Sequence, residues 1–128
     1  MPVFGIALGG ALGAVARHYV TIWSQEYLAR GVLHGFPVGT LLVNIVGSFL
    51  LAMVLMLSTQ GILPSALRLA IGTGFIGAFT TFSTFELDAH LLFEQGHHLR
   101  AAVYVLANLI LGYGAILLAR YLLADRSV

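Results

Sequence analysis

The sequence predicts an all-α integral membrane protein with four transmembrane helices in a single domain. Hydrophobic residues make up 59% of its 128 residues and charged residues only 9%, against about 25% charged in an ordinary soluble domain. The mean hydropathy of +0.97 agrees with this class. Residues 31–67 and 101–119 carry no charge, and one membrane helix needs about 20 apolar residues. One transmembrane domain is expected to cover residues 1–128.

Composition also argues against several kinds of site. The sequence has no lysine and no cysteine, which excludes disulfides and thiolate metal sites. Its six arginines are spread along the chain and its net charge is +1, so no nucleic-acid partner is expected. No nucleophile–base pair or metal-ligating cluster is expected at membrane depth. An enzyme is therefore not predicted.

Helix 1 is predicted at about residues 3–24, an apolar run that only Arg17 and His18 interrupt. Gly9 and Gly13 form a GxxxG pair, which suits close contact with another membrane helix. Arg17 has two interpretations that the sequence leaves open. A charge within a span is costly and is a functional candidate, or else its side chain reaches the interface near the helix end.

Helix 2 is predicted at about residues 37–59, because Pro37 fits a helix start. Asn44 is the polar side chain that stands out within it, with Thr40 one turn earlier and Ser48 one turn later. Because Asn44 lies about 10 Å from the helix start, its amide needs a partner inside the membrane. That partner is either a neighbouring helix or something that passes through the protein.

Helix 3 is predicted at about residues 65–95 and contains the stretch GTGFIGAFTTFSTF, residues 72–85. Each glycine costs a helix interior roughly 1 kcal/mol, and the threonine and serine hydroxyls can replace the helical ladder as partners of the backbone. One interpretation is a continuous helix that packs through small residues. The other is a helix broken at mid-membrane near residues 74–81, where irregular backbone must be buried or line a polar cavity. In a continuous helix four aromatic rings would form one stripe: Phe75, Phe79, Phe82 and Phe85.

Helix 4 is predicted at about residues 99–122 and is closed by charged residues, namely Arg120, Asp125 and Arg126. Tyr104, Asn108 and Gly112 repeat every four residues and therefore share one face. A polar face within a membrane helix is expected to contact protein or water rather than lipid. The acidic and histidine residues between Phe85 and this helix are interpreted as a solvated helix end.

The arginine distribution does not set an orientation in the membrane. The arginines expected on the two sides are Arg68, Arg120 and Arg126 against Arg30 and Arg100. A chain without such a bias can insert both ways, which would permit an antiparallel pair. An oligomer is expected in any case, because four short helices bury too little to surround a polar path.

Three motifs together resemble the CrcB/Fluc fluoride channel family: GALGAVARH around Arg17, GTLLVNIVGSFL around Asn44 and GFIGAFTTFSTF in helix 3. The resemblance implies an antiparallel, dual-topology homodimer in the inner (cytoplasmic) membrane, with helix 3 broken. It implies passive, selective fluoride efflux through two pores, and hence fluoride resistance. The implied partners are fluoride, membrane lipid and a second copy of the chain. The implied cofactor is a structural sodium ion at the dimer centre, with no organic cofactor.

The resemblance also assigns roles to residues by position. The family's pore asparagine corresponds to Asn44, and its vestibule arginine to Arg17. Main-chain oxygens of Gly77 and Thr80 from both subunits would hold the sodium ion. The remaining implied pore residues are Phe82, Phe85, Thr81, Ser83, Thr84, Tyr104 and Asn108. Asn108 and Gly112 stand where well-known members have serines, which leaves the lower pore lining open, and the roles of Glu86 and Asp88 also stay open.

Two other functions remain as alternatives. A small multidrug-type, proton-coupled exporter would need a carboxylate within helix 1, and the sequence has none between Val3 and Ser24. A non-conducting scaffold subunit would use Asn44 and the glycine- and threonine-rich stretch only to join helices. The chemistry of fluoride favours the channel, because a dehydrated anion needs hydrogen-bond donors, and amide, hydroxyl and aromatic ring edges supply them.

Overall fold

The computed structural model describes residues 2–124, whose regular structure is entirely helical. Four helical spans are long and apolar enough to cross a membrane: Pro2–Tyr27, Val38–Thr59, Ser65–Glu94 and His98–Leu123. The prediction of an all-α protein with four membrane-spanning helices is confirmed, and the chain is a multi-pass membrane protein. Asp125 and Arg126 lie outside the described residues.

Three of the spans are single helices: α1 (Pro2–Tyr27), α2 (Val38–Thr59) and α6 (His98–Leu123). A short 3-10 turn, η1 (Gly31–Leu33), lies between α1 and α2. The ends differ slightly from the predicted ones. α1 continues to Tyr27 instead of ending near residue 24, Pro37 precedes α2 as its cap residue, and α6 is one residue longer at each end than predicted.

The third span is divided into α3 (Ser65–Arg68), η2 (Leu69–Ile76), α4 (Gly77–Phe79) and α5 (Phe82–Glu94). η2 is a π-helix, in which the Gly77 N–H reaches back five residues to the Gly72 carbonyl. The sequence predicts an interruption over residues 74–81, but the glycine-rich part of that range remains helical. The chain leaves helical geometry only at Thr80 and Thr81. Buried Gly72 and Gly74 add no side-chain bulk, which suits the wide turns of a π-helix.

α1 packs against η2 through direct contact of backbones. A Cβ atom added to Gly9 would overlap the Ala70 carbonyl oxygen, and one added to Gly13 would overlap the Phe75 carbonyl oxygen. From the opposite side, a Cβ atom on Gly74 would lie 2.6 Å from the Ile6 carbonyl oxygen. The GxxxG pair of α1 thus makes the close helix contact that its pattern predicts.

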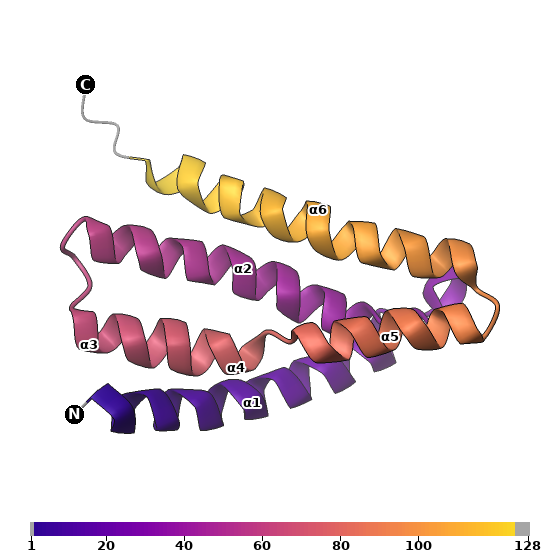
Figure 1. Ribbon diagram of the computed structural model, residues 1–128, viewed down its shortest axis with the longest axis horizontal. Helices are drawn as coiled ribbons and strands as arrows, with labels where there is room; N and C mark the ends of the chain where they lie inside the picture. Colours follow the sequence, from indigo (N-terminus) through magenta and orange to yellow (C-terminus); the bar gives the residue numbers. More distant parts are fainter. Residues whose placement is uncertain (1, 125–128) are drawn as a thin grey trace.

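The spans run roughly alongside one another, with α2 between α6 and the third span in the view of Figure 1. α1 lies against the first half of the third span, and α5 packs against α6. The connections alternate between the two ends of the molecule. The N-terminus, the α2–α3 connection and the end of α6 lie at one end, and the α1–α2 and α5–α6 connections lie at the other (Figure 1).

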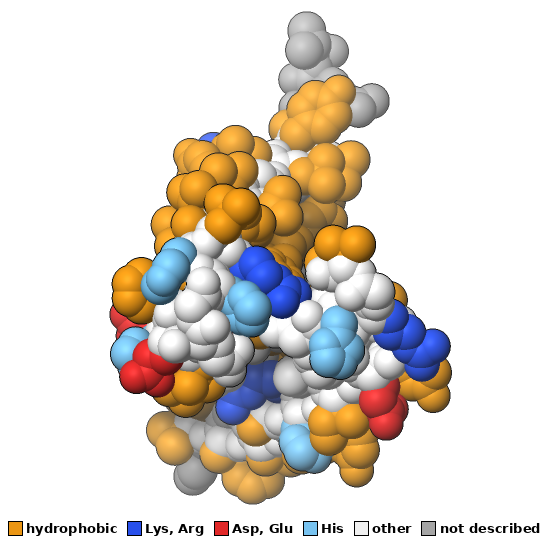
Figure 2. Space-filling model, turned by 90° about the vertical axis from the view of Figure 1, so that its right-hand side faces the viewer, with side chains coloured by type: hydrophobic (Ala, Val, Ile, Leu, Met, Phe, Trp, Pro, Cys, Tyr) orange, Lys and Arg blue, Asp and Glu red, His pale blue; other side chains and the backbone are white. Residues whose placement is uncertain are grey.

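Charged and histidine residues gather at one end of the bundle. Figure 2 shows arginine, acidic and histidine side chains together at the end that carries the α1–α2 and α5–α6 connections. There Arg100 donates hydrogen bonds to the carbonyl oxygens of His34, at 2.7 Å, and Val32, at 3.5 Å. Its guanidinium also lies 5.7 Å from the centre of the Phe36 ring. Arg100 thereby ties the α1–α2 connection to the start of α6.

The α1–η2 contact yields a test of the fold. Gly13→Ala is expected to lower the free energy of unfolding by about 1–3 kcal/mol, the usual cost of overpacking, because the new methyl group overlaps the Phe75 carbonyl oxygen. The shift in Tm of the detergent-solubilised protein measures this loss. Gly114→Ala is the matched control, since its new Cβ atom would have no neighbour within 4 Å. Equal Tm values for both variants would contradict the packing described above.

Candidate functional site

The interruption of the third span consists of two extended residues between two helices. Thr80 has φ −81° and ψ 159°, and Thr81 has φ −150° and ψ 120°. A helix end leaves four N–H groups or four carbonyl groups without helical partners. The carbonyl groups that end α4 and the N–H groups that begin α5 therefore meet at this point, within a membrane-spanning segment. Whether these carbonyl and N–H groups are paired within the protein determines whether they are free to bind an ion.

Thr81 caps the start of α5. Its Oγ1 accepts a hydrogen bond from the Thr84 N–H at 3.3 Å, and its hydroxyl group donates to Thr84 Oγ1 at 2.9 Å. Threonine in this position satisfies one of the N–H groups that a new helix leaves open. The side chain that the sequence singled out as a pore residue is thus also the structural cap of α5.

Asn44 of α2 closes the interruption from the side. Its Oδ1 accepts a hydrogen bond from the Thr81 N–H at 2.9 Å, and its Nδ2 donates to the Thr81 carbonyl oxygen at 3.1 Å. The same Nδ2 donates its second hydrogen to Asn108 Oδ1 of α6 at 3.0 Å. The two N–H groups and the oxygen of this amide are therefore all engaged. The partner that the sequence analysis required for Asn44 lies within the chain.

A chain of polar groups continues from Asn44 along α6. Asn108 donates from Nδ2 to the Tyr104 carbonyl oxygen at 3.0 Å. The Tyr104 hydroxyl donates to Asp88 Oδ2 at 3.2 Å, and Thr40 donates to the same oxygen at 2.7 Å. Four of these side chains lie one helical turn apart in pairs, Thr40 with Asn44 and Tyr104 with Asn108. We call these five residues together, Thr40, Asn44, Asp88, Tyr104 and Asn108, the polar network.

The polar network includes residues that the sequence analysis did not place in a site. Thr40 was noted only as a neighbour of Asn44, and Asp88 was left without a role. The four-residue spacing of polar side chains in α2 and in α6 was the available signal. This spacing could not show that the Asp88 carboxylate of α5 lies between α2 and α6. Asp88 follows the interruption, and the sequence does not give the direction in which α5 continues after it.

Arg17 reaches the interruption from α1. Its Nη1 donates to the Thr80 carbonyl oxygen at 3.3 Å, across 63 residues of sequence. The half-buried side chain therefore points toward the ends of α4 and α5 rather than away along the helix. Of the two interpretations that the sequence left open for Arg17, the structure favours contact with the interrupted backbone.

The interruption separates the four phenylalanines into two pairs. Phe75 stacks on Phe79 with ring centres 6.0 Å apart, and Phe82 lies 5.7 Å from Phe85. Phe85 is buried against Tyr104, whereas the Phe82 side chain is 68% exposed in the single chain. The single stripe that a continuous helix would form is therefore absent from the third span, because the extended residues lie between the two pairs.

The remaining predicted residues lie near the interruption but face the outside of the single chain. Gly77, Ser83 and Thr84 are exposed, and Thr80 is half-buried. Gly112 lies close to Ser48, since a Cβ atom added to it would be 3.6 Å from Ser48 Oγ. A polar surface of this kind in the middle of a membrane span needs a partner other than hydrocarbon.

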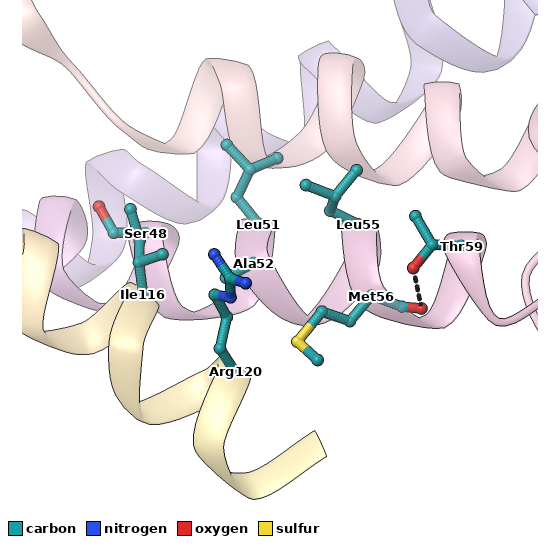
Figure 3. A pocket seen from close by; sticks show the side chains of 8 residues that line it. All are labelled: Ser48, Leu51, Ala52, Leu55, Met56, Thr59, Ile116 and Arg120. Carbon is teal, nitrogen blue, oxygen red and sulfur yellow. Dashed lines mark hydrogen bonds between the residues drawn. The ribbon is translucent and has the colours of Figure 1, made fainter. Parts of the chain in front are cut away.

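A hollow of about 200 Å³ opens beside the interruption. Its lining combines the Asn44 amide, two hydroxyl side chains of the threonine pair and the ring of Phe82, and consists of Asn44, Gly47, Ser48, Leu51, Thr80, Thr81 and Phe82. A larger groove of about 470 Å³ lies between α2 and α6 and shares Ser48 and Leu51 with the hollow. In Figure 3 the Arg120 side chain points from α6 toward α2 within this groove. Hydrogen-bond donors, and no acidic side chain, line both spaces.

Comparison with known proteins gives a family match over most of the chain. The model of the family described as CrcB-like protein, Camphor Resistance (CrcB), matches residues 4–120. A protein of Deinococcus radiodurans is 45% identical over 119 residues, which cover 91% of this chain and 90% of that protein. A protein of Shewanella amazonensis is 40% identical over 124 residues, 97% of each chain. A protein of Geobacter metallireducens is 40% identical over 111 residues, 86% of each chain. All three relatives carry the name fluoride-specific ion channel FluC.

The cap of α5 provides a test of the local structure. Thr81→Val keeps the shape of the side chain but removes the hydroxyl that caps α5, and such losses cost about 1 kcal/mol. We expect faster amide hydrogen exchange over residues 82–86, measured by mass spectrometry in detergent. Ser83→Ala, on an exposed side chain two positions away, should leave exchange in this segment unchanged. Equal exchange in the Thr81→Val variant and the unchanged protein would show that the hydroxyl does not cap the helix.

Proposed function

The chain belongs to the CrcB family, and on this basis we propose that it is not an enzyme but a fluoride-selective ion channel that lets fluoride leave the cell passively. The observation that carries the proposal is the interruption of the third span. It places backbone ends, the Asn44 amide and hydroxyl groups beside a hollow at mid-span. Such irregular backbone within a membrane is tolerated where it is buried in protein or lines a water-filled path.

The donors around the hollow suit a small anion that must give up its water. The Asn44 amide can donate to an anion when it gives up a present partner, the Ser48 hydroxyl is a further donor, and the edge of the Phe82 ring carries partial positive charge. Arg17 adds a full positive charge beside Thr80. Each neutral contact is weak by itself. Conduction requires this balance, since an ion must bind well enough to enter and loosely enough to leave.

The proposal includes a second copy of the chain. In the single chain Phe82, Ser83, Thr84 and Gly77 are exposed in the middle of a span, where lipid tails cannot satisfy polar groups. An antiparallel homodimer would cover this surface and, by symmetry, contain two pores. The described arginines do not favour one orientation, since Arg68 and Arg120 lie at one end and Arg30 and Arg100 at the other. Dual topology in the inner membrane is part of the proposal.

The proposal also includes a structural sodium ion at carbonyl groups of the interruption, those of Gly77 and Thr80. The Thr81 N–H donates to Asn44, so it does not continue the helical ladder to the Gly77 carbonyl. The Thr80 carbonyl already accepts from a cationic side chain, Arg17. Carbonyl oxygens are ligands of hard cations, and these two would hold sodium together with their equivalents in the second copy. Arg17 and sodium would then both interact with the Thr80 carbonyl oxygen. Because both are positively charged, each weakens the binding of the other there.

The exporter alternative gains no support from the structure. The ionisable side chain that α1 presents at mid-span is Arg17, whose positive charge would repel a cationic drug. A scaffold would need Asn44 only to join helices, whereas the channel would need it to bind the anion. Both alternatives are therefore separated from the channel by flux measurements.

Fluoride efflux from liposomes tests the channel. Liposomes that contain the protein, are loaded with potassium fluoride and are made permeable to potassium should release fluoride without any proton gradient, as followed with a fluoride electrode. Chloride-loaded liposomes should release far less anion. Equal release of both anions would remove the claim of selectivity. Efflux that requires a proton gradient, or export of a quaternary ammonium dye, would favour the exporter.

The same liposomes test the sodium ion. Assembly and assay in sodium-free potassium salts should lower the Tm of the protein and its fluoride efflux together, relative to the same liposomes with added sodium. Unchanged Tm and efflux would remove sodium from the proposal and leave the channel itself in place.

Asn44→Asp separates a pore from a scaffold. At about 4 Å and an effective dielectric constant of about 20, two negative charges repel by roughly 4 kcal/mol, equivalent to about a thousand-fold in rate. Fluoride efflux should therefore fall to background while cross-linking still detects the dimer. Loss of the cross-linked dimer in Asn44→Asp would favour the scaffold. Gly114→Asn, a polar change at an uncrowded position of α6, is the control and should conduct.

A further inference from the structure

Asn44 has no free side-chain N–H group in the described chain. Its amide oxygen accepts from the Thr81 N–H at 2.9 Å, and its two N–H groups serve the Thr81 carbonyl oxygen at 3.1 Å and Asn108 Oδ1 at 3.0 Å. Asn44 is also the residue that the polar network and the hollow share. An anion that reaches Asn44 through the hollow must therefore compete with an acceptor that the protein supplies.

The two acceptors of Asn44, the Thr81 carbonyl oxygen and Asn108 Oδ1, differ in how easily an anion could displace them. The Thr81 carbonyl belongs to backbone that is fixed by the cap of α5 and by the second bond to Asn44. Asn108 Oδ1 belongs to a side chain, which can rotate. The buried Asn108 amide presents this oxygen to Asn44 because its own Nδ2 donates to the Tyr104 carbonyl oxygen at 3.0 Å. Asn108 is therefore the replaceable partner.

We propose that Asn108 sets the affinity of the pore for fluoride by occupying the second N–H group of Asn44 when no ion is present. This inference rests on the proposed function. Fluoride binds Asn44 by taking the place of Asn108 Oδ1, so the gain from one hydrogen bond is offset by the loss of another. The exchange keeps binding weak and the ion mobile, as conduction requires. Asn108 acts through Asn44 and is a positioning residue.

The competition makes a quantitative prediction. Asn108→Ser keeps a hydroxyl that can bond to the Tyr104 carbonyl one turn earlier but no longer offers an acceptor at the distance of Asn44. The fluoride concentration at half-maximal efflux should fall about five-fold, which corresponds to one net hydrogen bond. The maximal rate should fall as well, because a tighter ion leaves more slowly. The ratio of fluoride to chloride efflux should stay the same, because either anion would displace the same acceptor.

Two further variants keep the outcome unambiguous. Asn108→Leu removes both hydrogen bonds at similar volume and should shift the half-maximal concentration in the same direction. Ser24→Ala removes the hydroxyl of a fully buried serine in α1, which bonds to Val20 and Thr21, and should leave the half-maximal concentration unchanged. A half-maximal concentration that is unchanged or raised in Asn108→Ser would overturn the proposal, and so would an equal shift in Ser24→Ala.

A measurement without flux separates this proposal from the proposed function. The chain contains two asparagines, Asn44 and Asn108, so ¹⁵N-asparagine labelling gives an NMR spectrum in micelles in which the side-chain amide of Asn44 is readily assigned. Asn108→Ser should move one Asn44 amide proton upfield, because that proton loses its acceptor. Added sodium fluoride should then shift this proton downfield, at a lower fluoride concentration than the one that changes the Asn44 signal in the unchanged protein. An Asn44 signal that does not respond to Asn108→Ser would overturn the inference even if fluoride flux is found. A normal response with no fluoride flux in the unchanged protein would overturn only the proposed function.

Discussion

The structure depends on one constraint: a backbone that stops being helical inside a membrane must find hydrogen-bond partners within the protein. Thr80 and Thr81 are the residues whose backbone groups need such partners, and neighbouring elements provide them. α2 contributes the Asn44 amide, which pairs with both polar groups of the Thr81 peptide. α1 contributes Arg17 to the Thr80 carbonyl oxygen. Thr81 itself caps α5, and within residues 2–124 no buried side-chain nitrogen or oxygen lacks a hydrogen-bond partner.

The rest of the fold serves to bring these partners within reach. The glycines of α1 allow its backbone to touch the π-helix η2, and this contact carries Arg17 to the interruption. Contact between α2 and α6 places Asn44 beside Asn108. The aromatic packing of Phe36, Phe85 and Tyr104 then orients α5 so that Asp88 meets Tyr104 and Thr40. Close packing and the polar network therefore depend on each other.

Much of this was readable from the sequence, and the part that was not has a physical cause. Apolar runs of about 20 residues gave the four spans, and the isolated Asn44 and Arg17 stood out because polar groups in lipid need partners. The position of the interruption was only bracketed. Glycine weakens a helix without deciding whether it breaks, and here Gly72 and Gly74 lie within the π-helix while the two β-branched threonines are extended. The pairing of Asn44 with Asn108 and the role of Asp88 depended on helix rotations that a single sequence does not encode locally.

The π-helix also limits which insertions and deletions the chain can accept. An α-helix turns by about 100° per residue, so deletion of a single residue between Leu69 and Ile76 would rotate everything that follows by roughly that angle. Thr81 would then face away from Asn44, although no side chain of the site had been altered. The number of residues in this segment therefore fixes the geometry of the interruption as much as their identities do.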